Sequence, residues 1–207
     1  MKQSQEMLSG NDILHFLKTL YFYDYSDVFK AASDKAYQDF CRTIRVPGFS
    51  EKGIKEKEDG RKAVTEYMRA RLTNKDGELD NVSDSVSFDQ WHDKTCKGII
   101  EQFSSCAHLH YGQAQKWLNM TCKYLCALEE PHVLPLFPWL HAPIDTIVFE
   151  RAITLGVRNT TGKAWSTWEE NDYKTYQNAL RSAVKKAEGD TYPLLLWEWR
   201  NWKPAKA

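Results

Sequence analysis

The sequence predicts an all-α protein in which two helical lobes surround a cleft. Apolar residues recur at three- and four-residue spacings along most of the chain, and no stretch shows the strict alternation typical of a half-buried strand. Glycine, proline and short polar clusters separate the periodic stretches. The chain has 207 residues, 42% hydrophobic and 27% charged, which is ordinary for globular proteins. Residues 1–207 are therefore expected to form a single unit with a sizeable core.

The first half of the chain predicts four helices, at residues 11–25, 26–44, 63–72 and 88–103. Asn11 is the expected N-cap of the first helix. The mixed-charge run at 51–62 (EKGIKEKEDGRK) is predicted to be a solvated loop or a frayed helix. The polar stretch at 73–86 (TNKDGELDNVSDSV) is predicted to be a linker, at which the chain can divide into the two lobes.

The second half predicts four more helices, at residues 113–128, 145–156, 168–186 and 194–202. The first of these carries apolar side chains over so broad a face that it should be largely buried. Four prolines between Pro131 and Pro143 predict an irregular connection after it. The pair Asp145-Thr146 then opens the next helix, which ends at Gly156.

The composition of the chain argues against a membrane protein, a secreted protein and a strongly basic nucleic-acid-binding protein. No apolar run reaches the roughly 18 residues that a membrane helix needs, and the start MKQSQEMLSGND lacks the layout of a secretory signal. The expectation is a cytoplasmic monomer without a membrane partner, whose five cysteines, an odd number, are reduced. Lys and Arg total 28, as do Asp and Glu, so any binding to nucleic acid must come from a local patch.

Two charged residues at predicted helix starts suggest a reactive site. Lys116 lies in the first turn of a strongly apolar helix, where the helix dipole disfavours a cation. Such a lysine should lose its proton more readily than a free one, which makes it a candidate amine nucleophile. Asp145 begins the next helix. Its carboxylate can stabilise a developing positive charge, such as an oxocarbenium-like sugar, if the fold brings it opposite Lys116.

Three motifs follow one another in residues 106–156: GQAQK ending at Lys116, VLP from Val133, and PIDTIVFERAITLG from Pro143. This order resembles the helix-hairpin-helix DNA glycosylases, and most closely their archaeal 8-oxoguanine branch. In that family a hairpin leads into a helix with a catalytic lysine near its start, and a proline-containing segment opens the helix with the catalytic aspartate. The resemblance thus implies a hairpin-helix element and a catalytic aspartate segment within 106–156.

The resemblance implies a base-excision repair enzyme, a DNA glycosylase with associated AP lyase activity. Its partner would be double-stranded DNA carrying an oxidised or otherwise modified base, which the enzyme flips out of the duplex. Asp145 would stabilise the sugar cation while Lys116 attacks C1′. Trp91 and Trp197 resemble the two tryptophans of the family's base pocket. The residues expected to contact DNA are His110, Gly112, Gln113 and Lys123, with backbone amides of the Gly112 turn on a phosphate. No metal or cofactor is implied.

The sequence leaves a second function open, a non-catalytic helical module that binds nucleic acid or protein. Asp145 has the sequence context of any helix N-cap, a lone first-turn lysine is usually solvated, and single tryptophans usually fill cores. The chain also departs from the family, because Pro193 stands where the pocket aspartate is expected. The alternation of Cys106, His108 and His110 has poor spacing for zinc, so buried thiols are favoured there.

Overall fold

The computed structural model describes residues 9–44 and 51–202, with side chains of the second range from Ile54 onward, and every regular element in these ranges is helical. The α-helices are α1 (Gly10–Phe22), α2 (Val28–Phe40), α3 (Glu51–Leu72), α4 (Ser85–Phe103), α5 (Tyr111–Ala127), α6 (Thr146–Ala152), α7 (Glu170–Glu188) and α8 (Leu194–Asn201). Short 3-10 turns are η1 (Cys41–Thr43), η2 (Glu78–Asn81), η3 (Leu134–Leu136), η4 (Ile153–Leu155) and η5 (Trp165–Thr167). The all-α prediction is confirmed for the described residues.

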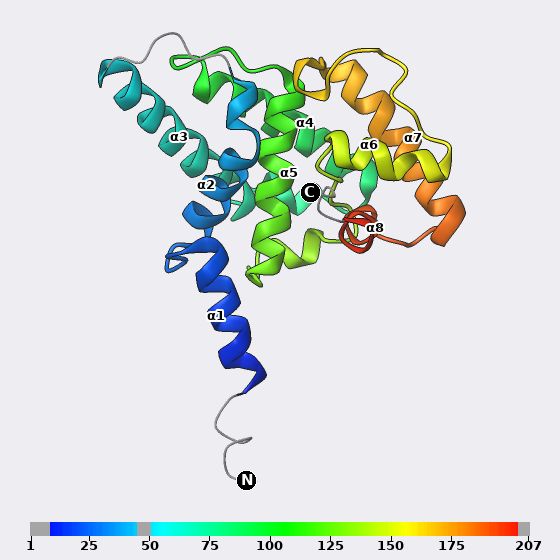
Figure 1. Cartoon of the computed structure of the whole chain (residues 1–207), viewed down its shortest axis with the longest axis horizontal. Coiled ribbons are helices and arrows are strands. Elements are labelled where there is room, and N and C mark those ends of the chain that lie inside the picture. Colours follow the sequence, from blue (N-terminus) through cyan, green and yellow to red (C-terminus); the bar gives the residue numbers. More distant parts are fainter. Residues whose placement is uncertain (1–8, 45–50, 203–207) are drawn as a thin grey trace.

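Helix α5 forms the centre of the fold. It stands between α2 and α3 on one side and α6, α7 and α8 on the other (Figure 1). All its residues are buried except Lys123 and Ala127, which confirms the burial predicted from its broad apolar face. Trp117 lies at its middle, fully buried, with its ring 5.0 Å from Tyr37 and 5.6 Å from Phe40 of α2. The indole nitrogen donates to the Ser33 carbonyl at 3.2 Å, so this large side chain leaves no unpaired donor.

One apolar cluster extends from Phe29 on α2 to Trp197 on α8. Helices α3 and α4 pack directly on each other, although the polar stretch 73–84 separates them in sequence. Arg71 at the end of α3 pairs with Asp76 at 2.6 Å and with Glu78 at 3.1 Å, which holds that stretch against the helix ends. The linker therefore joins two packed helices that contribute to the same core.

Two elements differ from the sequence prediction. Residues 51–62, predicted as a solvated loop or a frayed helix, form the first turns of α3, because Glu and Lys are good helix formers and the following apolar stretch continues the same helix. Arg61 also pairs with Asp34 of α2, which ties this polar region to its neighbour. The N-cap of α1 is Ser9 rather than Asn11, since the Ser9 hydroxyl accepts from the Asp12 amide in a capping box.

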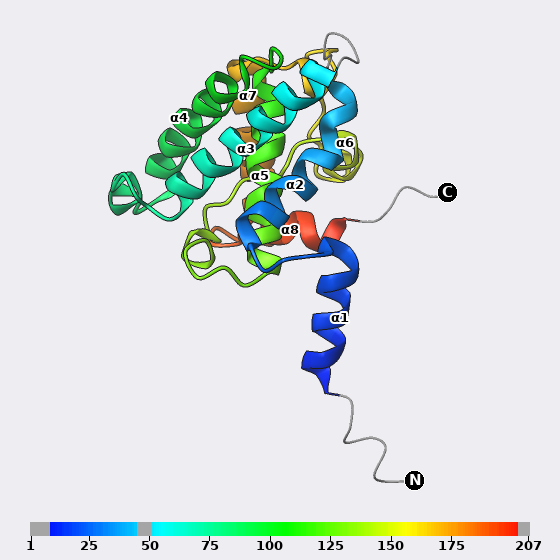
Figure 2. The ribbon, with the colours of Figure 1, turned by 90° about the vertical axis from the view of Figure 1, so that its left-hand side faces the viewer.

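The apolar face of α1 does not join the core. No residue of α1 is buried, and Phe16 and Leu20 are 61% and 64% exposed. The helix extends away from the rest of the molecule in both views (Figures 1 and 2). Among the described residues, no helix is long and apolar enough to cross a membrane.

The first turn of α5 is fixed by contact with η5. The Gly112 amide donates to the Trp168 carbonyl at 2.9 Å, and a Cβ at position 112 would overlap the carbonyl oxygen of Trp165. Gly112 is thus required for close approach of two backbone segments, since any side chain would force them apart.

Gly112→Ala is expected to lower the free energy of unfolding by about 1–3 kcal/mol, because the added methyl group must displace backbone atoms. Urea denaturation measures this change. Gly10→Ala is the matched control, since no atom of the described residues lies within 4 Å of its Cβ position, and it should change stability by less than about 0.5 kcal/mol. Equal stability of the two variants would contradict the packing role of Gly112.

Candidate functional site

A cavity of about 530 Å³, here called the lysine cavity, lies beside α5. Its charged lining residues are Asp39, Arg42, Lys116, Lys123, Asp145 and Glu198, and its aromatic lining residues are Tyr21, Tyr124, Trp165 and Trp202. The volume falls within the range of roughly 300–1,000 Å³ usual for small-molecule sites. The described residues contribute three cations and three anions to its lining, so their formal charges balance.

Lys116 and Asp145 are in contact within this cavity. The Lys116 Nζ lies 2.6 Å from Asp145 Oδ2 and 3.4 Å from the Pro143 carbonyl oxygen, and Lys116 is only 4% exposed. The other carboxylate oxygen of Asp145 accepts from the Val148 amide at 2.9 Å, which makes Asp145 the N-cap of α6. The predicted cap is therefore correct, and the same carboxylate also faces the lysine. The two residues proposed from sequence as a reactive pair are brought together.

A second ion pair lies on the same cavity, between α5 and α8. Lys123 is two helical turns after Lys116, on the same face of α5, and its Nζ lies 2.8 Å from Glu198 Oε1. Burial raises the pKa of Glu198, and the nearby Lys123 ammonium opposes that shift. Glu198 Oε2 is buried and has no hydrogen-bond partner within residues 9–44 and 51–202. Sequence reasoning missed Glu198, although a single carboxylate within the apolar run LLLWEWRN was a usable signal.

Neither tryptophan predicted for the base pocket lines the lysine cavity. Trp91 is 3% exposed on the core face of α4, 5.5 Å from the Phe88 ring, with the Arg71 guanidinium 5.3 Å from its ring centre. Trp197 is also 3% exposed and lies against α6, beside a cavity of about 10 Å³ that holds at most one water. Both are core residues because they fall on the apolar stripes of their helices. The rings at the lysine cavity belong to other positions, Trp165 and Trp202 among them.

The predicted phosphate site at the start of α5 is also corrected. The Gly112 amide donates to the Trp168 carbonyl, and the Gln113 amide donates to the His110 carbonyl at 3.0 Å. The Gln113 side chain is buried and donates to the Thr43 carbonyl at 2.8 Å. The His110 ring lies 3.0 Å from the Glu169 carboxylate, which would repel an anion. The groups of His110, Gly112 and Gln113 therefore already have partners within the protein. Of the four residues predicted to contact DNA, Lys123 lines the lysine cavity and the other three do not.

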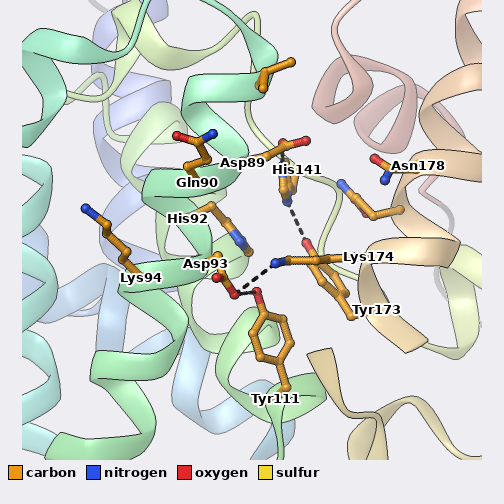
Figure 3. A pocket seen from close by; sticks show the side chains of 12 residues that line it. Asp89, Gln90, His92, Asp93, Lys94, Tyr111, His141, Tyr173, Lys174 and Asn178 are labelled. Carbon is orange, nitrogen blue, oxygen red and sulfur yellow. Dashed lines mark hydrogen bonds and ion pairs between the residues drawn. The ribbon is translucent and has the colours of Figure 1, made fainter. Parts of the chain in front are cut away.

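A second cavity, of about 430 Å³, lies between α4 and α7 and is here called the histidine cavity. It is lined by Val86, Asp89, Gln90, His92, Asp93, Lys94, Tyr111, His141, Tyr173, Lys174, Gln177 and Asn178. Figure 3 shows His141 between Asp89 and the Tyr173 hydroxyl. His141 Nε2 lies 2.6 Å from Asp89 Oδ1, and Nδ1 lies 2.8 Å from the Tyr173 oxygen. The Arg181 guanidinium, which contacts the same Asp89 carboxylate, also lies 2.9 Å from His141 Nε2.

The histidines of this cavity are held neutral. His92 and His141 are 1% and 5% exposed, and burial lowers the pKa of both imidazoles. Burial alone would raise the pKa of Asp89, but hydrogen bonds from Arg181 and His141 outweigh it and lower that pKa. The guanidinium of Arg181 contacts both carboxylate oxygens, at 2.7 and 2.8 Å. The arrangement is therefore an anion compensated by a half-buried cation, next to two rings whose neutral form is favoured by burial.

The cap formed by Asp145 can be separated from its ion pair by substitution. Asp145→Asn and Asp145→Ala both remove the charge beside Lys116, but only asparagine keeps an oxygen for the Val148 amide. The alanine variant should unfold more easily than the asparagine variant by about 0.5–2 kcal/mol in urea denaturation. The same pair of substitutions at Asp84, the N-cap of α4, is the control and should give a similar difference. Equal stability of the Asp145 variants would show that the cap contributes nothing.

Acidification from pH 7.5 to 5.0 should destabilise the protein through His92 and His141. Their pKa values in the folded protein lie below the unfolded value of about 6.5. At a pH between the folded and unfolded pKa values, the unfolded state therefore binds more protons. Their stabilisation is complete above pH 6.5 and is lost as pH falls toward the folded pKa values, by at most about 1.4 kcal/mol per pH unit for each histidine. His92→Gln should show a shallower dependence in urea titrations. His108→Gln, at an exposed histidine, should keep the original slope, and an unchanged slope in His92→Gln would refute the assignment.

Comparisons of the chain with protein-family models, curated proteins and solved structures found no match. The similarity of residues 106–156 to the glycosylases thus stays a prediction from short motifs. The function has to be inferred from the residues of the two cavities, and the contact between Lys116 and Asp145 is the arrangement with the clearest chemistry.

Proposed function

We propose that this protein is a DNA base-excision repair glycosylase with AP lyase activity, whose site is the lysine cavity. The observation that carries the proposal is the 2.6 Å contact between Lys116 and Asp145, at positions 29 residues apart. In this proposal the hairpin-helix element corresponds to α4, residues 104–110 and α5. The lysine cavity is then the cleft between two helical lobes. The enzyme would be a cytoplasmic monomer that acts on double-stranded DNA without a cofactor.

The chemistry requires Lys116 as a neutral amine, so the ammonium that pairs with Asp145 first releases one proton to solvent. Its lone pair forms a bond to C1′ while the bond from C1′ to the base breaks, and the departing base takes the proton that the lysine nitrogen releases. The nitrogen lone pair then forms the C=N bond while the bond from C1′ to O4′ breaks, and O4′ takes a proton from solvent, which gives a protonated Schiff base. Loss of a C2′ proton then expels the 3′ phosphate and cuts the strand. Asp145 is placed to stabilise positive charge at the sugar, because its Oδ2 lies beside the nitrogen that attacks.

Aromatic side chains rather than net charge supply recognition in this proposal. Tyr21, Tyr124, Trp165 and Trp202 line the cavity, and flipped bases stack on such rings. Trp202 is 48% exposed and therefore accessible to an incoming strand. The Lys123 Nζ lies 5.6 Å from the centre of the Trp202 ring, so a DNA strand at this place would meet a cation and an aromatic ring side by side.

Borohydride trapping on duplexes with an abasic site, 8-oxoguanine, uracil or an alkylated base tests the proposal. The wild-type protein should form a covalent adduct with at least the abasic duplex, and Lys116→Gln should reduce it to background because the attacking amine is absent. Lys30→Gln, at a 68% exposed lysine on α2, is the matched control and should trap fully. A full yield of adduct in Lys116→Gln would assign the amine to another residue.

Base removal from an intact lesion separates Asp145 from Lys116. Asp145→Asn should keep the helix cap yet slow base release by roughly 100-fold or more, since it removes the charge that stabilises the sugar cation. Release of free base is measured in single-turnover assays. If folded wild-type protein yields neither adduct nor free base on any duplex, the non-catalytic module becomes the better explanation. Steep loss of DNA affinity with rising salt would then identify a nucleic-acid binder, and no such affinity a protein binder.

A further inference from the structure

The histidine cavity contains a buried amide that is not satisfied by the protein. Gln177 of α7 lines this cavity and is 1% exposed. Among the residues that the structure describes, neither its Nε2 nor its Oε1 has a hydrogen-bond partner. Buried amides are paired in most proteins, and leaving both a donor and an acceptor unpaired is unfavourable. The Gln177 amide can therefore bind a ligand that presents a hydrogen-bond acceptor next to a donor.

The charged groups on the wall of the histidine cavity are paired with groups of opposite charge. Asp89 is compensated by Arg181, and Asp93 lies 2.8 Å from Lys97 Nζ. Lys174 lies 2.5 Å from Glu170, and Lys94 lies 3.5 Å from Glu78. Because each of these charges already has a partner of opposite sign, a neutral ligand meets no uncompensated charge.

Aromatic rings form much of the remaining wall, beside Val86, Gln90 and Asn178. The His92 ring is stacked on the Tyr173 ring with centres 5.7 Å apart and an interplanar angle of 13°, and the Tyr111 ring lies 5.5 Å from Tyr173. These side chains converge from α4, α5 and α7 (Figure 3). Flat rings at the wall favour a flat ligand, since stacking maximises contact area.

We propose that the histidine cavity binds a small neutral heterocycle whose edge carries a hydrogen-bond donor beside an acceptor, the class of nucleobases and nucleosides. Gln177 pairs with that edge through its amide, in the two-point contact that glutamine makes with bases. The volume of about 430 Å³ is sufficient for a small molecule of this class. This inference rests on Gln177 and is independent of Lys116 and of glycosylase activity.

Calorimetric titration of the full chain with uridine, guanosine, adenosine and cytidine tests the proposal. The controls are 3-methyluridine and 1-methylguanosine, because their N-methyl groups remove the hydrogen-bond donor from the recognised edge. At least one unmodified nucleoside should bind. If uridine or guanosine binds, its methylated partner should bind at least about tenfold more weakly. A short single-stranded oligonucleotide in a parallel titration distinguishes a free nucleoside from a base within a strand. Absence of binding by every probe at millimolar concentration, or equal binding of a nucleoside and its methylated partner, would overturn the proposal.

Gln177→Leu is the decisive variant, because leucine has similar size and no hydrogen-bonding group. It should lose at least about tenfold in affinity for the bound nucleoside while the ligand-free protein keeps or gains thermal stability, since an unpaired amide is removed. Gln102→Leu, at an exposed position on α4, is the matched control and should bind as wild type. Unchanged affinity in Gln177→Leu would exclude the assigned contact. A large loss of stability in the free variant would show that the amide is structural, which also contradicts the proposal.

Discussion

Two buried amides on α5 hold the segment 141–145, and the geometry of both cavities depends on this anchoring. Gln115 Oε1 accepts from the Ile144 amide at 3.3 Å, and its Nε2 donates to the Ile144 carbonyl at 3.1 Å. Asn119, one turn later, donates to Gln115 Oε1 and to the Ala142 carbonyl. A buried segment outside a helix needs such partners for its backbone groups. Without them the segment would have no fixed position against α5.

The anchored segment contributes to both sites. His141 at its start lies in the histidine cavity, and Asp145 at its end lies in the lysine cavity. Asn119 also donates to the Tyr173 hydroxyl and pairs with His92 Nε2, so the same amide that fixes the backbone orders the rings of the histidine cavity. A change in the polar interior of α5 is therefore expected to affect both cavities together, through a shared hydrogen-bond network.

Ion pairs inside the molecule explain how the fold can bury lysine side chains of α5. Lys116 and Lys123 point to one cavity from one helix face, and each is matched by a carboxylate from a different element, Asp145 before α6 and Glu198 in α8. Burying either cation without its partner would be costly. The Lys116 pair thus joins α5 to the N-cap residue of α6 and is also a candidate for catalysis.

The sequence by itself determined most helices, the burial of α5 and the cap at Asp145, because helix periodicity and capping depend on residues three or four positions apart. It also suggested the Lys116–Asp145 pair, but only through a motif order, and it could not establish their contact. Tertiary structure decided which rings face the lysine cavity, that the Gly112 amide is used by Trp168, and that the apolar face of α1 stays exposed. It also revealed Glu198 and Gln177. Those outcomes depend on partners far away in the chain, whose positions are set by how the helices pack and not by any local pattern.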